Sequence, residues 1–94
     1  MENPIEQGDI VTAKTGRDKG KYFLVVTTEI GIANIVNGKD RKVQNPKKKN
    51  LKHIKKVSTL SLKDLAEKIQ SGQPIANKRI YLAIMAEKQK LQED

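Results

Sequence analysis

The first half of the chain alternates short apolar runs with breaks that contain glycine, proline or asparagine. The runs are rich in Ile and Val, which is typical of β-strands. Such strands, joined by tight turns over about 50 residues, predict a mainly β fold, a small SH3-like β-barrel covering residues 1–57. The four or five expected strands are Asp9–Lys14, Tyr22–Thr28, Ile32–Val36, Lys39–Gln44 and, as a last short one, Leu51–Ile54.

The breaks between these runs carry specific turn signals. Gly31 ends a short turn after the second run. Asn37-Gly38 predicts a type I′ hairpin turn, because that turn needs two positive φ angles, which Asn and Gly adopt most readily. Pro46 lacks an amide hydrogen and should end the strand that returns from this hairpin, so we expect Lys47–Asn50 to form a basic loop.

The pattern changes to helical spacing after Val57. Ser61 and Asp64 approximate a capping box at the start of a helix over 62–70, and Gly72 is placed to end it. A second helix should start near Asn77, its expected N-cap. Two short helices are not stable alone, so residues 58–94 should form an extension packed on the barrel. The apolar residues at helical spacing are Leu62, Leu65, Ala66 and Ile69 in the first helix, and Ile80, Ala83, Ile84 and Leu91, widened by Tyr81 and Met85, in the second.

The net charge of +8 is concentrated in one segment. Residues 37–56 hold nine cations and one acid, whereas the remainder of the chain holds ten of each. Self-repulsion makes such a segment costly unless a polyanion neutralises it, which favours nucleic-acid binding. The alternative interpretation is an ordinary solvated face.

The loop over 15–21, T-G-R-D-K-G-K, is a second candidate site. Gly16 and Gly20 allow a tight backbone with positive φ. Three cations and one hydroxyl project from this loop, and loop amides can approach a phosphate closely. The alternative is that the loop only connects two strands.

In the stretch 8–26, glycine, charged and valine residues stand at a distinctive spacing: Gly8, Asp9, Val11, Gly16, Lys19, Gly20 and Val25. With these residues the stretch resembles the KOW motif of ribosomal and transcription-associated proteins. Phe23 stands where many KOW motifs carry another glycine; the branch similar to the large-subunit ribosomal protein family known as L14e tolerates this change. The similarity continues through Asn37-Gly38 to Leu51–Ile54, and small bacterial KOW-domain RNA-binding proteins have the same layout.

This resemblance implies a protein that binds structured ribosomal RNA of the large subunit without catalysis, in translation or ribosome assembly. Structured RNA is read through its shape and phosphates, which a basic barrel edge can contact. The chain has only three aromatic residues, which argues against reading single strands by stacking. The expected RNA-binding residues are Thr15, Arg17, Lys19 and Lys21 in the first loop, and Lys39, Arg41, Lys42, Lys47, Lys48, Lys49, Lys52 and His53 in the basic segment.

Other function classes find little support in the sequence. The chain has no cysteine and a single histidine, so we expect no metal site, no cofactor and no disulfide. No oriented acid completes a catalytic triad near His53, so we expect no enzymatic activity. No apolar run approaches the roughly 20 residues of a membrane span, and a cytoplasmic monomer without membrane contact is expected.

Two other functions remain open. One is a protein–protein interaction module of the transcription or translation machinery, with the Ile80–Met85 stripe contacting a ribosomal protein or polymerase. The other is a non-specific DNA or nucleoid binder.

Overall fold

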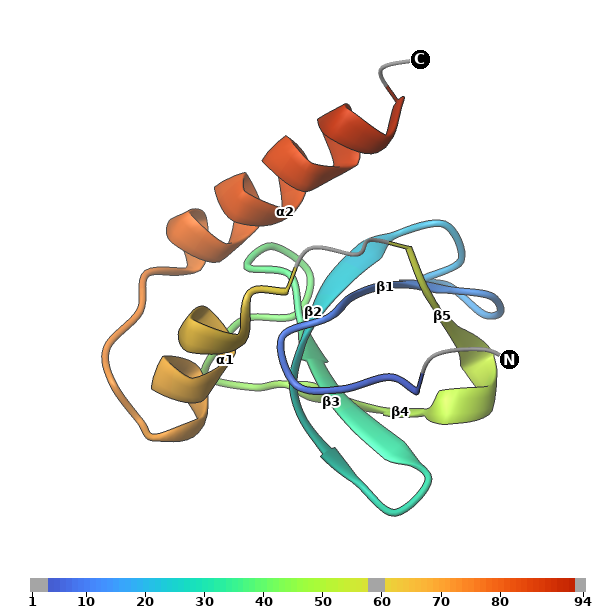
Figure 1. The fold of residues 1–94 in the computed structure, drawn as a ribbon, viewed down its shortest axis with the longest axis horizontal. Helices are drawn as coiled ribbons and strands as arrows, with labels where there is room; N and C mark the ends of the chain where they lie inside the picture. Colours follow the sequence, from blue (N-terminus) through green and yellow to red (C-terminus); the bar gives the residue numbers. More distant parts are fainter. Residues whose placement is uncertain (1–3, 58–60, 93–94) are drawn as a thin grey trace.

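The computed structural model describes residues 4–57 and 61–92. A five-stranded antiparallel sheet is followed by two helices that lie together on one side of it (Figure 1). The expected class, mainly β with a helical extension, is therefore correct at this level. In chain order the elements are β1 (Ile10–Ala13), β2 (Tyr22–Glu29), β3 (Ile32–Val36), β4 (Lys47–Asn50), the 3-10 turn η1 (Leu51–His53), β5 (Ile54–Lys56), α1 (Lys63–Gln70) and α2 (Asn77–Gln92).

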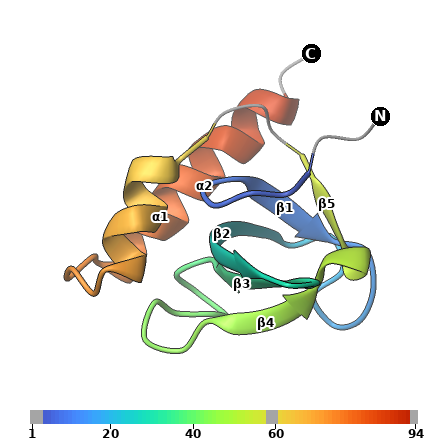
Figure 2. The same cartoon turned by 60° about the horizontal axis from the view of Figure 1, so that its bottom comes forward.

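The strands are ordered β4-β3-β2-β1-β5 in the sheet. The two edge strands, β4 and β5, follow each other along the chain and are separated only by η1. Figure 2 shows the sheet curling away from the helices, with η1 spanning the space between its two edges. The curl brings the loops at one end of the sheet close to β4 and β5.

The centre of the sheet is buried on both faces, which explains the continuous apolar run in the first half of β2. Phe23 and Val25 point into the curl, and Leu24 and Val26 point toward the helices. All four side chains are at most 4% exposed. The inner cluster also contains Val11, Ala13, Ala33, Ile35 and Ile54, and the helix-side cluster contains Val36, Leu65, Ile69, Ile80 and Ile84.

The first helix has nearly the predicted bounds but not the predicted cap. Leu62 is the N-cap and no side chain caps the helix, so Ser61 and Asp64 do not form a capping box. The amide of Leu62 instead donates to the carbonyl oxygen of Gly8 (2.8 Å), which ties the helix start to the sheet. At the other end Gly72 has φ +84° and ends the helix as predicted.

The second helix packs through the predicted stripe, and its expected N-cap has another role. Ile80 and Ile84 are buried against the sheet, whereas Leu91 is 40% exposed. The side-chain oxygen of Asn77 accepts from the amide of Val43 (2.7 Å). Asn77 therefore holds the loop 37–46 against α2 instead of capping the helix.

The fourth strand is not where the sequence predicts it. Residues 39–44 form no strand, and the strand that pairs with β3 is Lys47–Asn50, which we expected to be a loop. Asn37 does not take a positive φ, so no type I′ turn forms. Its side-chain oxygen accepts from the amides of Lys39 and Arg41 (3.0 and 2.9 Å), and this local turn begins a longer loop.

The last predicted strand is also divided differently. Leu51–His53 form the 3-10 turn η1, and β5 begins only at Ile54. Asn50 caps this turn by accepting from the amide of Lys52 (2.9 Å). Leu51 and Ile54 are nevertheless packed in the inner cluster as expected. Residues 58–60, where the barrel and the helical extension were expected to meet, lie outside the described part of the chain. In that part no helix is long and apolar enough to cross a membrane.

Gly8 makes a testable contribution to this fold. A Cβ at Gly8 would lie 2.5 Å from the backbone nitrogen of Lys63, and φ there is +92°. Gly20 has a similar φ, +84°, but no atom within 4 Å of a Cβ. Gly20→Ala should cost only the backbone strain, about 1–2 kcal/mol, and Gly8→Ala should cost about 1–3 kcal/mol more because α1 must move. Urea unfolding of both variants measures the difference; equal losses would contradict the packing of α1 on Gly8.

Candidate nucleic-acid interface

The loop between β1 and β2 is fixed at its base. The amide of Gly20 donates to the carbonyl oxygen of Ala13 (3.1 Å), and the amide of Lys19 donates to that of Gly16 (3.2 Å). Gly16 and Gly20 have φ values of +79° and +84°, as the sequence predicts. The side chains of Thr15, Arg17 and Lys19 are exposed on this fixed loop.

Pairing of β1 with β5 places the second basic segment beside this loop. Thr12 pairs with Lys55 and Ala13 pairs with Ile54. Beyond the strand, the amide of Lys14 donates to the carbonyl oxygen of His53 (2.8 Å). The exposed side chains of η1 and β5 therefore lie next to the β1–β2 loop, although more than thirty positions separate them in the sequence.

Two lysines of β4 also reach the loop. Lys47 pairs with Ile35 and Lys49 pairs with Ala33, so their side chains start from the inner face of the sheet. The ammonium of Lys47 lies 2.7 Å from a carboxylate oxygen of Asp18. That of Lys49 lies 3.8 Å from the position that a Cβ would occupy on Gly16. Both lysine side chains thus extend from β4 across the curled sheet to the β1–β2 loop.

Asp18 is a buried carboxylate that interacts with several cations at this end of the sheet. It is 5% exposed, and the hydrogen bond from Lys47 holds the pKa of its carboxyl below the ordinary value, against the opposing effect of burial. The charges of Lys47, Arg41 and Lys21 lower this pKa further. One of these cations, Lys21, also lies 3.4 Å from Asp40. Asp18 and Asp40 therefore neutralise cations that the sequence offered as RNA contacts.

Asp40 is in turn held within the loop 37–46. The side-chain amide of Asn37 donates to its carboxylate (3.2 Å). This bond is the main cause of a lowered pKa for Asp40, to which the nearby Lys21 adds. The loop is thus joined to the β1–β2 loop by the Lys21–Asp40 ion pair and to α2 by Asn77.

Lys48 points away from the two lysines beside it. Its ammonium lies 3.6 Å from a carboxylate oxygen of Glu29, which also accepts from the side-chain amide of Asn34 (3.0 Å). That hydrogen bond and, after it, the charge of Lys48 lower the pKa of Glu29. The run Lys47–Lys49 is therefore not one basic loop, because its side chains leave opposite faces of β4.

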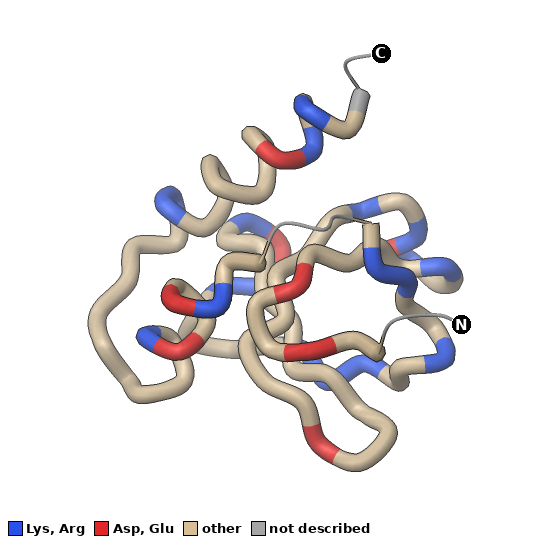
Figure 3. The backbone as a smooth tube through the Cα atoms, in the orientation of Figure 1, with Lys and Arg blue, Asp and Glu red and all other residues tan. Residues whose placement is uncertain are grey.

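The cations of the β1–β2 loop and of the basic segment divide into two groups. The first gathers where loop 14–21, η1, β5 and β4 meet, as the blue segments of Figure 3 show, and we call it the basic end. Among the residues that the structure describes, no carboxylate forms an ion pair with any cation of the basic end. Its residues are Lys14, Arg17, Lys19, Lys49, Lys52, His53 and Lys55.

The second group of predicted residues lies elsewhere or is already paired. Lys39, Arg41 and Lys42 belong to the loop that packs against α2. Lys21, Lys47 and Lys48 form ion pairs with carboxylates. Conversely, the sequence prediction missed Lys14 and Lys55. Lys14 directly precedes the predicted loop and was assigned to the end of the first strand, whereas Lys55 reaches the loop only through the β1–β5 pairing.

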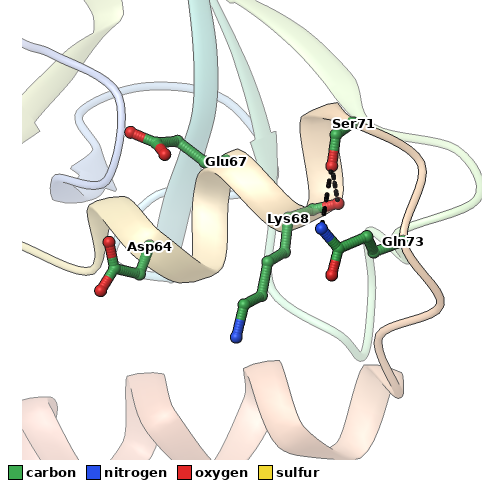
Figure 4. A pocket seen from close by; sticks show the side chains of 5 residues that line it. All are labelled: Asp64, Glu67, Lys68, Ser71 and Gln73. Carbon is green, nitrogen blue, oxygen red and sulfur yellow. Dashed lines mark hydrogen bonds between the residues drawn. The ribbon is translucent and has the colours of Figure 1, made fainter.

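The described residues show no metal site and no anion-binding pocket on α1. In 4–57 and 61–92, no cluster of His, Asp or Glu could hold a metal ion. An open pocket on α1 is lined by Asp64, Glu67, Lys68, Ser71 and Gln73 (Figure 4), and its two carboxylates do not suit an anion. No protein-family model and no curated protein matches the chain.

The Asp18–Lys47 contact can be tested by a double-mutant cycle. Asp18→Asn and Lys47→Gln should each destabilise the protein at neutral pH, and the pair should be coupled by about 0.5–3 kcal/mol. Because the folded-state pKa of Asp18 is lowered, its contribution is complete above the unfolded-state value of about 4 and is lost as pH falls through the folded-state value. The stability difference between the native protein and Asp18→Asn should therefore shrink in acid. Additive losses in urea unfolding, or a difference independent of pH, would contradict the pair.

Proposed function

We propose that this protein binds structured RNA through the basic end, without catalysis. The observation that carries the proposal is the gathering of six cations without described carboxylate partners from four separate segments. Five of these six residues are exposed and one, Lys49, is half-buried. A phosphate backbone offers regularly spaced anions that several of these cations could contact at once. Release of counterions from the RNA would provide the driving force. The cations are Lys14, Arg17, Lys19, Lys49, Lys52 and Lys55.

RNA is favoured over duplex DNA because the basic end is built from loops and strands and contains no α-helix that could enter a major groove. The apolar faces of α1 and α2 are occupied by the sheet. α1 carries both signs of charge, whereas α2 carries cations near both of its ends and one acid, Glu87, which is buried. A curved sheet end with cations on rigid loops fits the irregular grooves of folded RNA, which are read by shape and backbone. A non-specific DNA or nucleoid binder is the competing function.

We further propose that the domain is an SH3-like barrel of the KOW type, similar to the L14e-like ribosomal branch. The glycines of the motif support this, since Gly8, Gly16 and Gly20 all take positive φ. The direct connection from β4 to β5 through η1 supports closure of the sheet. Ribosomal RNA of the large subunit is then the proposed partner, with a role in translation or ribosome assembly in the cytoplasm.

A protein-interaction module is the second candidate function. The expected contact stripe, Ile80–Met85, is wrong in detail, because Ile80 and Ile84 are buried against the sheet. The outer surface of α2 supports the function instead, because Leu82 is 53% exposed and Leu91 is 40% exposed. A ribosomal protein or a component of the transcription machinery would contact this surface. Such binding would persist after nuclease treatment and at high salt, unlike binding by the basic end.

Charge reversal tests the proposed RNA site. The triple variant Arg17→Glu, Lys19→Glu and Lys52→Glu should lose binding to a structured ribosomal RNA fragment, because three phosphate contacts become repulsive. In the native protein about five phosphate contacts give a log–log salt slope near −3.5 to −4.5, which the variant should not retain. Filter binding or fluorescence anisotropy across salt concentrations measures both quantities, with duplex DNA as competitor.

The matched control is Lys63→Glu, Lys68→Glu and Lys90→Glu, which changes the net charge equally but lies on the helices. It should weaken binding only through the general field. Equal losses in the two triple variants would exclude the basic end as the RNA site, and preferential binding to duplex DNA would favour the competing function. Co-sedimentation with the large ribosomal subunit tests the proposed partner.

A further inference from the structure

A pocket lies between the loop 37–46 and the first turns of α2, away from the basic end. It is lined by Gly38, Lys39, Lys78 and Tyr81, and its volume is about 400 Å³. Figure 1 shows this loop, drawn in green, beneath the start of α2. The pocket is open to solvent and large enough for one nucleotide.

The pocket is preformed because the loop is fixed on the helix. A Cβ at Gly38 would collide with the carbonyl oxygen of Asn77 and approach the backbone nitrogen of Tyr81 to 3.0 Å. Asn77 also accepts from the amide of Val43 (2.7 Å) and donates its side-chain amide to Gln44 (2.9 Å). The walls of the pocket are therefore held in place without a ligand.

The lining combines an aromatic ring with two ammonium groups. The ammonium of Lys39 lies 6.0 Å from the ring centroid of Tyr81, at the outer limit of a cation–π contact. A flat ring that displaced this ammonium from the face of Tyr81 would therefore break only a weak contact. No carboxylate of the described residues lines the pocket, and the neighbouring Asp40 is held by Asn37 and Lys21. A ligand that is both flat and anionic matches this lining.

The charge at the start of α2 also favours an anion. The first turn contains Lys78 and Arg79 and no acid. Cations at this end of a helix are unfavourable, because the helix dipole is already positive there. In α1, by contrast, the first turn carries Asp64. A bound phosphate would neutralise part of this unfavourable positive charge at the start of α2.

We propose that this pocket takes one unpaired nucleotide of the bound RNA, with its base stacked on Tyr81 and its phosphate between Lys39 and Lys78. This inference rests on the proposed RNA binding and adds a preference for RNA with a bulged or looped-out nucleotide. The other tyrosine does not offer the same platform. Tyr22 packs partly buried in the helix-side cluster, with the ammonium of Lys88 5.2 Å from its ring centroid. With a single platform, the protein selects one displaced base and not a single strand.

Tyrosine fluorescence provides a direct test. The chain has two tyrosines and no tryptophan, so Tyr22→Phe leaves Tyr81 as the only fluorescent residue of this kind. A hairpin RNA with one bulged uridine should quench its emission, and the same hairpin without the bulge should not. Free uridine monophosphate should quench only at far higher concentration, because it lacks the phosphate contacts at the basic end.

Affinity measurements on variants at position 81 complete the test. Tyr81→Leu should weaken binding of the bulged hairpin about 5- to 150-fold, the usual effect of removing one stacking residue. Tyr81→Phe should retain the affinity, and neither change should affect the fully paired hairpin. If both hairpins bind but neither quenching nor the Tyr81→Leu effect depends on the bulge, the nucleotide pocket is refuted while RNA binding stands. If neither hairpin binds, the proposed function fails as well, and tighter binding of the free nucleotide would refute RNA as its source.

Discussion

Burial of β2 on both faces is the constraint on which the structure depends. Phe23 and Val25 must be covered by the curl of the sheet, and Leu24 and Val26 must be covered by the helices. Fully burying one such side chain contributes about 1.5–3 kcal/mol, so neither face can be left open in so small a domain. The curl brings β5 beside β1, and the helices hold the loop 37–46. Both candidate binding surfaces follow from covering this one strand.

The second organising feature is the buried carboxylate of Asp18. A buried charge is costly unless it is paired, and Lys47 reaches across the curl to pair with it. This pair joins the β1–β2 loop to the edge strand β4. Lys47 therefore has a structural role, in contrast to the cations of the basic end, which form no ion pair with a described carboxylate. Reversing the charge of the whole run Lys47–Lys49 would therefore test folding and binding together, which is why the proposed variants avoid it.

Three strands and two helices could be predicted from the sequence, because their apolar residues follow clear periods. The fourth strand could not: K-K-K-N has no apolar residue, and its backbone pairs with β3 while Lys47 bonds to Asp18, a partner distant in sequence. The predicted helix caps were wrong for a similar reason. The side chain of Asn77 and the amide of Leu62 make bonds to segments distant in sequence, which no local pattern contains.

The candidate site was predictable in composition but not in arrangement. Counting charges located the basic segment, but the count gave equal weight to Lys47 and Lys48, which form ion pairs, and to Lys52, which has no carboxylate partner among the described residues. Only the pairing of β1 with β5 places Lys55 on the same surface as Lys14 and the β1–β2 loop. In the proposed RNA binding, net charge would set the long-range attraction to the polyanion, whereas the cations of the basic end, held on rigid backbone, would set the register. In this protein the two properties reside in overlapping but different sets of residues, so changes in salt and changes in sequence should separate them.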